Sequence, residues 1–185
     1  MSSKACVFIA EGLEEIEGLT VVDILRRAQI DTQMVSITDE RLVSGSHQIP
    51  IQTDVCMKDA DFSKTELLVL PGGMPGTLHL GACKSLTDLL VRFHKEGKCV
   101  AAICAAPSVL GDLGILKGKK AACYPSFESR LTGADVVYDE VAVDGNVITS
   151  RGMGTAIPFA LALVEKLLSK EKAEELGKDI IFRCC

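Results

Sequence analysis

The stretch Cys99-Val-Ala-Ala-Ile103, followed at once by Cys104-Ala-Ala-Pro107, decides the fold of this chain. Its first five residues are all apolar or small, which is typical of a strand that is buried on both faces of a sheet. Pro107 fits the first turn of a helix, where its missing N–H is not needed. A buried strand that runs straight into a helix is the unit of a parallel sheet covered by helices. We therefore expect an α/β fold with Cys104 at a strand-to-helix turn.

Apolar segments of strand length alternate with amphipathic segments along the whole chain. The expected strands are Lys4–Ala10, Asp31–Ile37, Leu67–Leu70, Lys98–Ile103, Lys120–Cys123, Val136–Tyr138 and Asn146–Ser150. The expected helices are Glu14–Ala28, Ser85–Lys95, Ala105–Leu113, Pro125–Leu131, Gly154–Ser169 and Lys170–Gly177. The segment Arg41–Thr53 alternates and contains Gly45 and Pro50, which favours a hairpin or an excursion at the sheet edge. This pattern predicts a mostly parallel sheet with helices on both faces, in a single domain of residues 1–185.

Composition and charge exclude several classes of protein. The chain has 185 residues, of which 48% are hydrophobic and 24% charged, and its formal net charge is -5. That sign argues against a general nucleic-acid surface or an anionic membrane as the main partner. No stretch approaches the roughly 18 apolar residues of a membrane span, and the first apolar run is too short for a signal peptide. We expect a cytoplasmic protein.

Metal and nucleotide sites are not expected. Eight cysteines occur without a Cys-x-x-Cys pair, and three histidines are too few to favour a zinc site. A chain of this size does not need disulfides, and Cys184 and Cys185 are expected to be incidental thiols at a flexible end, or to form intermolecular disulfides under oxidation. The run Gly152-Met-Gly154-Thr-Ala-Ile157 lacks the third glycine of a dinucleotide-binding loop, and no P-loop is present. We therefore expect neither a metal nor a cofactor.

The position of Cys104 favours a reactive role. A nucleophile elbow exposes its side chain at such a turn, with small neighbours that avoid clashes. The start of the following helix points amides at the sulfur, which is expected to favour the thiolate. The alternative is a buried, inert cysteine at a strand end.

Three further strand ends carry candidate residues. Pro71-Gly72-Gly73 ends a neighbouring strand, and the amides of Gly73 and Ala105 could form an oxyanion hole; an ordinary turn is equally compatible with the pattern. Glu17 lies beside the apolar face of its helix, so its carboxyl could be neutral and donate a hydrogen bond to a thiolate. Alternatively, as a carboxylate it could simply stabilise the start of the helix through the helix dipole. Arg151 could hold an anion or a carboxylate of the fold.

Four motifs together resemble the ThiJ/PfpI superfamily, in the branch of the Parkinson-associated protein deglycase. They are Glu14-Glu-Ile-Glu17, Leu70-Pro-Gly-Gly73, Ala101-Ala-Ile-Cys-Ala-Ala-Pro107 and Thr149-Ser-Arg-Gly-Met-Gly-Thr155, in the same order and at similar spacing. The resemblance implies a flavodoxin-like three-layer sandwich and a homodimer. It implies that Cys104 is the reactive, readily oxidised cysteine and Glu17 the protonated carboxyl beside it, with Gly72, Gly73 and Ala105 around the substrate oxygen.

Three positions depart from the best-known pattern of this branch. Tyr124 stands where a histidine is expected near the cysteine, and a tyrosine hydroxyl is a poor base near neutral pH. His47 replaces an arginine of the subunit contact, and Met153 replaces a proline. Proton transfer is therefore expected to depend on Glu17, with Tyr124 and Arg151 as further substrate-binding residues.

The resemblance implies a cofactor-independent glyoxalase or deglycase that acts on methylglyoxal-type dicarbonyls or on glycated protein side chains. The alternative is an oxidative-stress sensor or redox-regulated chaperone that uses oxidation of the same cysteine. A cysteine peptidase is disfavoured, because that branch has a histidine directly after the nucleophile and this chain has Ala105. The sequence does not select the physiological substrate.

Overall fold

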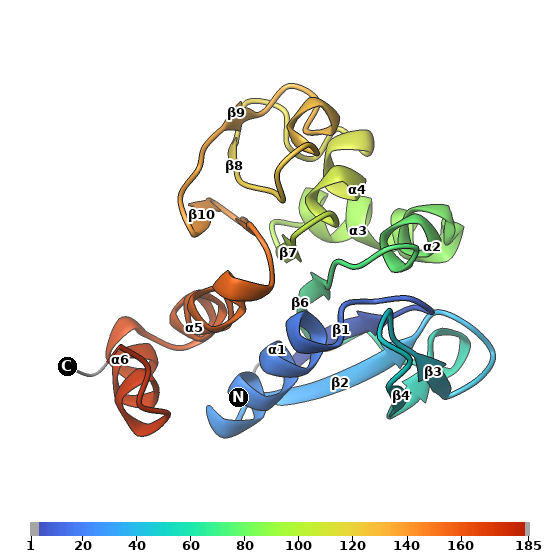
Figure 1. The fold of residues 1–185 in the computed structure, drawn as a ribbon, viewed down its shortest axis with the longest axis horizontal. Helices are drawn as coiled ribbons and strands as arrows, with labels where there is room; N and C mark the ends of the chain where they lie inside the picture. The colour runs from blue at the N-terminus through green and yellow to red at the C-terminus, as the bar shows by residue number, and fades with distance from the viewer. Residues whose placement is uncertain (1–3, 184–185) are drawn as a thin grey trace.

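A seven-stranded sheet forms the centre of the computed structural model, which describes residues 4–183 (Figure 1). The strand order is β10-β11-β7-β6-β1-β2-β5, and all neighbours are parallel except β10 and β11. The strands are β1 (Lys4–Ile9), β2 (Asp31–Ser36), β5 (Val55–Cys56), β6 (Thr65–Leu70), β7 (Cys99–Ile103), β10 (Val141–Asp144) and β11 (Val147–Ser150). The mostly parallel α/β sheet expected from the sequence is confirmed.

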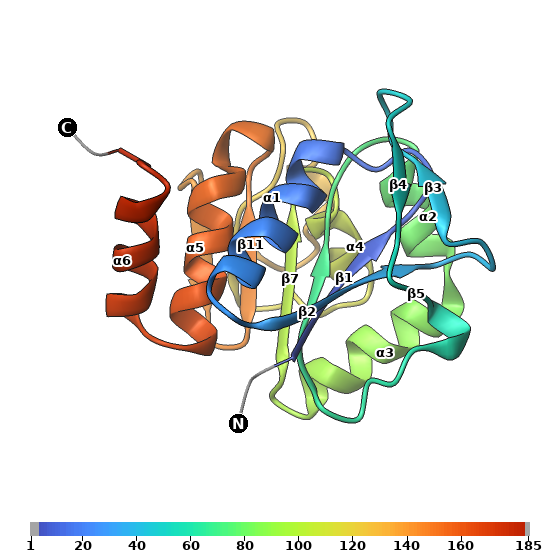
Figure 2. The ribbon, with the colours of Figure 1, turned by 90° about the horizontal axis from the view of Figure 1, so that it is seen from below.

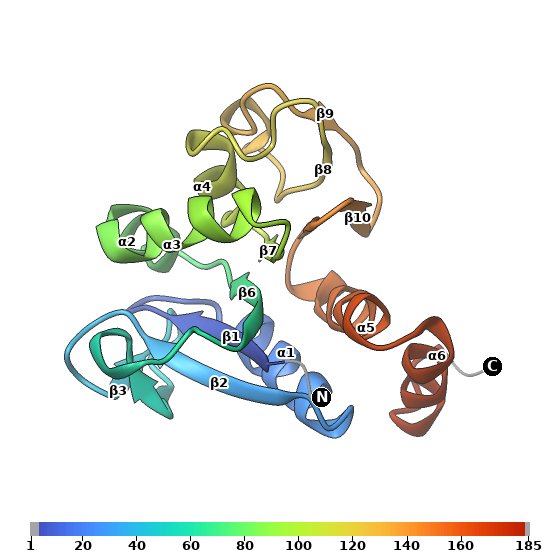
Figure 3. The ribbon, with the colours of Figure 1, turned by 180° about the vertical axis from the view of Figure 1, so that it is seen from behind.

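Helices cover both faces of the sheet, as Figure 2 shows. One face carries α1 (Glu15–Arg27) and α5 (Ala156–Leu167), with α6 (Lys170–Asp179) packed outside α5. The other face carries α2 (Gly76–Ala82), α3 (Lys84–Lys95) and α4 (Pro107–Asp112). Figure 3 shows the two groups from behind, on opposite sides of the strands. Within residues 4–183, no helix is long and apolar enough to cross a membrane.

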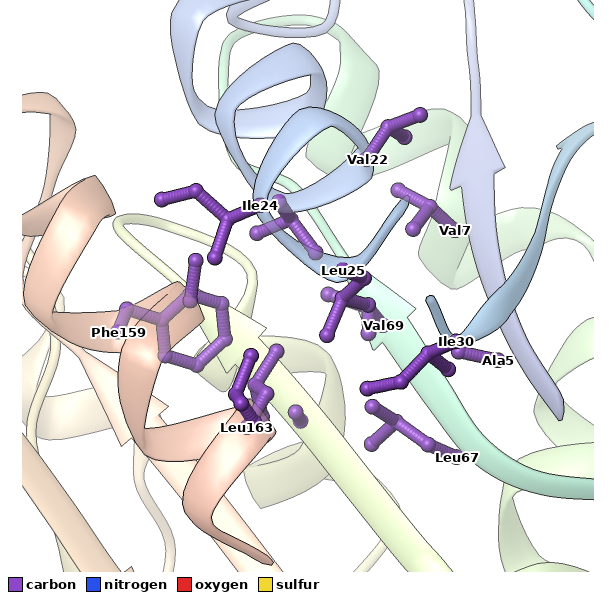
Figure 4. Packing of buried hydrophobic residues seen from close by; sticks show 14 of the residues in the cluster. Ala5, Val7, Val22, Ile24, Leu25, Ile30, Leu67, Val69, Phe159 and Leu163 are labelled. Atoms are coloured by element: carbon purple, nitrogen blue, oxygen red, sulfur yellow. The ribbon is translucent and has the colours of Figure 1, made fainter. Parts of the chain in front are cut away.

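Alternate residues of each central strand fill one of two hydrophobic cores, because successive side chains point to opposite faces. Val7 and Val69 pack with Leu25 of α1 and Phe159 of α5 on one face (Figure 4). Phe8 and the other alternate positions join the second core, under α3 and α4. Since the central strands are buried on both sides, their polar loops gather at the strand ends, where ligands bind in sheets of this kind.

The predicted hairpin at Arg41–Thr53 is confirmed. β3 (Leu42–Ser44) pairs antiparallel with β4 (Pro50–Gln52) as a separate two-stranded sheet beside the start of α1. A third small sheet pairs β8 (Lys120–Ala121) with β9 (Asp135–Val136) in parallel.

The partner of β11 differs from the prediction. The sequence suggested Val136–Tyr138 on the other side of the Asp144–Gly145 turn, but β10 occupies that place. A two-residue turn with Gly145 at φ 63° joins strands that lie directly next to it, so Val141–Asp144 pairs with β11, whereas Val136 pairs with β8.

Several helix boundaries also differ from the prediction. α3 begins at Lys84, one residue before the predicted start at Ser85, and α4 begins at Pro107 because a turn fills positions 104–106. Pro125–Leu131 contains only a 3-10 turn at Glu128–Arg130, and α2 was not predicted because its two glycines weaken the helical pattern. Two further 3-10 turns lie at Met57–Asp59 and Met153–Thr155. Cys184 and Cys185 lie outside the described residues.

Candidate active site

Cys104 lies at the turn between β7 and α4 in an unusual backbone conformation. Its φ is 66°, a left-handed value that a residue with a Cβ seldom adopts and that tends to occur at functional sites. The Cys104 N–H donates to the carbonyl of Ser150 (3.0 Å), and its carbonyl accepts from the N–H of Tyr124 (2.7 Å). Two neighbouring segments therefore hold the turn in place and leave the half-buried thiol at the end of the sheet.

Glu17 lies in the first turn of α1 and is only 1% exposed. The Gly72 N–H donates to its Oε2 (2.9 Å), while Oε1 has no partner in hydrogen-bond geometry within residues 4–183. Burial raises the pKa of Glu17 to about 7, against the opposing influence of the Cys104 thiol and the Gly72 N–H. The negative charge of Glu14 adds to the increase. Glu17 is therefore a carboxyl that gains and loses a proton near neutral pH.

The prediction that the start of the helix favours the Cys104 thiolate is wrong in its net direction. Burial, followed by the charge and hydrogen bonding of Glu17, raises the pKa of Cys104 to about 12. The N–H groups of Ala105 and Gly73 act in the opposite direction, as expected for amides that face the sulfur. The two amides are correctly placed, but a buried site beside a carboxylate outweighs them.

Cys104 and Glu17 titrate as a pair rather than as separate acids. Burial raises the pKa of both groups, and that of Cys104 is the higher, so when the pair holds one proton the proton lies mainly on the sulfur. When Glu17 holds that proton, its neutral carboxyl no longer opposes a thiolate at Cys104. The amides of Ala105 and Gly73 stabilise this form of the pair. A thiolate at Cys104 is therefore favoured when Glu17 is protonated.

Gly72 lies in contact with both members of the pair. A Cβ at this position would lie 2.6 Å from the Cys104 Cβ and 2.6 Å from Glu17 Oε2. The neighbouring Gly73 has φ 90°, and a Cβ there would lie 2.2 Å from the backbone nitrogen of Glu14. Only glycine fits at either position, which brings the loop amides close to the reacting groups.

Replacement of Gly72 with alanine is expected to lower the free energy of unfolding by about 1–3 kcal/mol, the usual cost of overpacking a buried site. It should also separate the Cys104 and Glu17 side chains. Denaturant unfolding measures the first effect. Gly154→Ala is the matched control, because a Cβ at Gly154 meets nothing within 4 Å. Equal stability of the two variants would contradict the close contact at Gly72.

Tyr124 and Gly152 lie on another side of Glu17. A Cβ at Gly152 would lie 3.3 Å from Cδ2 of Tyr124 and 4.0 Å from Glu17 Oε1. Tyr124 is exposed, so its ring borders the site from the solvent side. The sequence prediction missed Gly152 as a site residue, although it lies inside the fourth motif.

Arg151 has no carboxylate partner within residues 4–183. Its guanidinium lies over the ring of Tyr138, 5.6 Å from the centroid, and its Nε is buried without a hydrogen-bond partner. Burial and the charge of Glu128 raise the pKa of Cys123 to about 11, and the charge of Arg151 opposes that increase; Arg151 is not among the influences on the pKa of Cys104. The predicted substrate role of Arg151 thus has less geometric support than those of Gly73 and Ala105.

Each histidine is engaged away from the thiol. His47 contacts Glu15, His79 Nδ1 bonds the carbonyl of Glu11, and His94 lies beside Asn146. In the described part of the chain, no histidine of the cysteine-peptidase type therefore lies beside Cys104. The titratable side chain that contacts the thiol is Glu17.

The chain belongs to the DJ-1/PfpI family, whose model matches residues 3–166. The particular proteins that it resembles include protein dj-1beta of Drosophila melanogaster, which is 38% identical over 98% of both chains. The glutathione-independent glyoxalase DJR-1.2 of Caenorhabditis elegans is 33% identical over 92% of this chain and 91% of its own. Protein DJ-1 homolog B of Arabidopsis thaliana is 38% identical over 98% of this chain, and this chain spans only 42% of it.

Solved structures share the fold closely. Oxidised DJ-1 of Toxoplasma gondii superposes with a TM-score of 0.95 at 33% identity, and the match covers 99% of this chain and 100% of the Toxoplasma gondii chain. DJ-1beta of Drosophila melanogaster has a TM-score of 0.93 at 39% identity, with 98% of each chain covered. The flavodoxin-like three-layer fold expected from the sequence is thereby confirmed.

Proposed function

We propose that the protein is a cofactor-independent glyoxalase and deglycase that acts on methylglyoxal-type dicarbonyls or on early glycation adducts of protein side chains. The observation that carries the proposal is the pairing of Cys104 with a buried carboxyl whose pKa lies near 7. General acid–base catalysis is most efficient when the group titrates near the working pH. The similarity to a relative named as a glutathione-independent glyoxalase supports the same chemistry.

The proposed reaction begins when the Cys104 thiolate adds to the aldehyde carbon of methylglyoxal and forms a hemithioacetal. The N–H groups of Gly73 and Ala105 stabilise the negative oxygen that develops. Glu17, which has taken the Cys104 proton, gives it to that oxygen and becomes a carboxylate. It then removes the proton from the former aldehyde carbon and returns it to the neighbouring carbon, while the hydroxyl proton moves to the second oxygen, which gives a lactate thioester. Water hydrolyses the thioester, releases lactate and restores the thiol, so methylglyoxal and water are consumed in equal amounts.

The test is lactate formation from methylglyoxal without glutathione. We expect the wild-type protein to produce lactate at a rate that depends on Cys104. A protein that forms no lactate, while mild peroxide oxidises Cys104 before any other cysteine, would instead be the oxidative-stress sensor or redox-regulated chaperone. That second candidate is favoured by the half-buried thiol and by the oxidised state named for the similar Toxoplasma gondii structure.

A cytoplasmic location forms part of this proposal. Six cysteines lie between residues 4 and 183, and none of them forms a disulfide with another, which suits a reducing compartment. Neither a membrane nor a specific nucleic acid is proposed as a partner, in line with the net charge of -5.

A homodimer is also proposed, on the basis of one exposed apolar surface. Ile16 and Leu19 of α1 lie with Ile49, Ile157 and Ile181 around a hollow of about 710 Å³. Exposed apolar side chains that gather on one face favour burial against another protein. A second copy suits this face, because a two-fold contact uses the same patch on both subunits.

The substitution Ile49→Glu is expected to shift the protein from dimer to monomer, because it places charges inside the proposed contact. Light scattering coupled to size exclusion measures the change. Val143→Glu is the control, because Val143 is 53% exposed, Ile49 is 52% exposed, and Val143 lies away from this hollow. A wild-type protein that is already monomeric would contradict the proposal.

A further inference from the structure

The loop between β11 and α5 contacts both members of the Cys104–Glu17 pair. The carbonyl of Ser150, the last residue of β11, accepts the N–H of Cys104 at 3.0 Å. Two residues further on, the buried Gly152 borders the carboxyl, because a Cβ on Gly152 would lie 4.0 Å from Glu17 Oε1. A residue that fixes the shape of this loop therefore also affects the pair.

The side chain of Thr155 is the centre of the hydrogen bonds inside this loop. Its Oγ1 accepts from the N–H of Gly152 at 3.1 Å and lies 2.7 Å from the hydroxyl of Ser150. The Ser150 hydroxyl in turn donates to the carbonyl of Glu140 at 2.6 Å. One side chain thereby joins the two loop residues that contact the pair.

The number of protons fixes the direction of these bonds. A hydroxyl carries one proton, and that of Ser150 is engaged with the carbonyl of Glu140. The contact of 2.7 Å is therefore a hydrogen bond only when Thr155 donates to Ser150. The other possible acceptor, the carbonyl of Gly152 at 2.9 Å, already accepts the N–H of Thr155 at 2.8 Å. The bonds thus run in one direction, from Gly152 through Thr155 and Ser150 to Glu140.

Loss of the Thr155 hydroxyl would leave the N–H of Gly152 without this acceptor in a buried position. A buried donor without a partner is costly, so the loop would shift or admit water to satisfy it. Water at Gly152 would also reach Glu17 Oε1, which is buried and has no hydrogen-bond partner within residues 4–183. The hydroxyl of Thr155 thus determines whether the Glu17 carboxyl is hydrated.

Hydration of Glu17 would change how it titrates. Burial is the largest cause of its raised pKa, the Cys104 thiol opposes the increase, and the charge of Glu14 adds to it. Tyr124 borders the site and Arg151 lies in the loop, but neither is among the influences on the pKa of Glu17. Since burial dominates, entry of water should lower this pKa, whereas a loss of stability alone would leave it unchanged.

We propose that Thr155 is a positioning residue, which acts through Gly152 and Ser150 to exclude water from Glu17 and to hold the turn of Cys104. Within residues 4–183, its hydroxyl bonds inside its own loop and not to the pair itself. The proposal rests on the proposed function in one respect, namely that Cys104 and Glu17 are the reacting groups.

The test is the pH dependence of Cys104 alkylation by iodoacetamide, followed by peptide mass spectrometry because the chain has eight cysteines. Thr155→Val replaces the hydroxyl with a methyl group of similar size. We expect the midpoint of the rise in alkylation near pH 7 to move to lower pH by about 0.5 unit or more, because burial contributes most to the raised pKa of Glu17. Thr155→Ser keeps the hydroxyl and should restore the wild-type profile.

Thr87→Val is the matched control, since it makes the same change in α3, where the Thr87 hydroxyl bonds the carbonyl of Lys84 at 3.0 Å. Its alkylation profile should match that of the wild type. Circular dichroism establishes that each variant is folded. If Thr155→Val is unfolded, Ser150→Ala takes its place with the same expected shift, because it removes the acceptor of the Thr155 hydroxyl.

Two results would overturn the positioning role. One is a folded Thr155→Val protein whose alkylation profile coincides with that of the wild type. The other is a Thr155→Ser profile that is displaced as far as that of Thr155→Val. Because the thiol itself is measured, a protein that forms no lactate but shows the expected shift keeps the role of Thr155 and loses only the proposed reaction.

Discussion

Replacement of Cys104 with serine is expected to reduce lactate formation from methylglyoxal by about 10³-fold or more, the scale seen when a nucleophile is removed from an enzyme. A serine hydroxyl is similar in size but remains protonated under the same conditions. Glu17 then has no acidic thiol from which to accept a proton. The fold should be preserved, because serine can keep both backbone hydrogen bonds of Cys104, to Ser150 and to Tyr124.

The measurement is the initial rate of lactate formation at equal protein concentration. Cys83→Ser is the matched control, since Cys83 is also a partly exposed thiol and lies at the start of α3. We expect the control to keep nearly full activity. If Cys104→Ser and Cys83→Ser turn over methylglyoxal at the same rate as the wild type, the proposed nucleophile is wrong.

Replacement of Glu17 with glutamine is expected to lower kcat/KM by about 10²- to 10⁴-fold near pH 7, the usual contribution of a general acid–base group. In the wild type, activity should increase as pH rises through about 7, because the pair then loses its first proton and the thiolate form becomes available. A glutamine cannot take up the Cys104 proton. The variant should therefore lack the change near pH 7 and gain activity only at higher pH.

A second readout concerns stability and has a defined sign. The pKa of Glu17 is about 7 in the folded protein, against 4.5 as the ordinary value in an unfolded chain. The folded protein therefore binds more protons than the unfolded chain between those values, and the free energy of unfolding should decrease as pH rises from about 4.5 to about 7. Glu17→Gln should remove this dependence. Denaturant unfolding at several pH values measures it, and parallel curves for the two proteins would contradict the buried carboxyl.

Much of the fold and part of the site follow from local sequence. The apolar run Cys99–Ile103 and its helix start place Cys104 correctly, because strand burial and helix capping are local effects. The burial of Glu17 was predicted from its position next to Ile16, but Ile16 is itself exposed, so the direction of Glu17 was right and the reason for it was wrong. The alternation that predicts the Arg41–Thr53 hairpin is likewise contained within a few residues.

The remainder depends on contacts between distant segments. The direction of the Cys104 pKa could not be predicted, since it follows from burial and from a carboxyl that another strand–helix unit supplies. The place of Gly152 in the site could not be predicted either, because Tyr124 and Glu17 approach it from different parts of the chain. Arg151 was open between two roles, and only its neighbours in space show that no carboxylate of residues 4–183 pairs with it.

The hydrogen bond from the Cys104 N–H to the carbonyl of Ser150 joins the reactive turn to the last strand of the parallel sheet along the chain. The carboxyl partner comes from the first helix, and the glycine between them from β6 and its loop. During synthesis on the ribosome, Cys104 therefore emerges before β11, the strand that supplies the carbonyl of Ser150. The left-handed backbone conformation of Cys104 and its contact with Glu17 therefore belong to the completed sheet, and a partly synthesised chain lacks both.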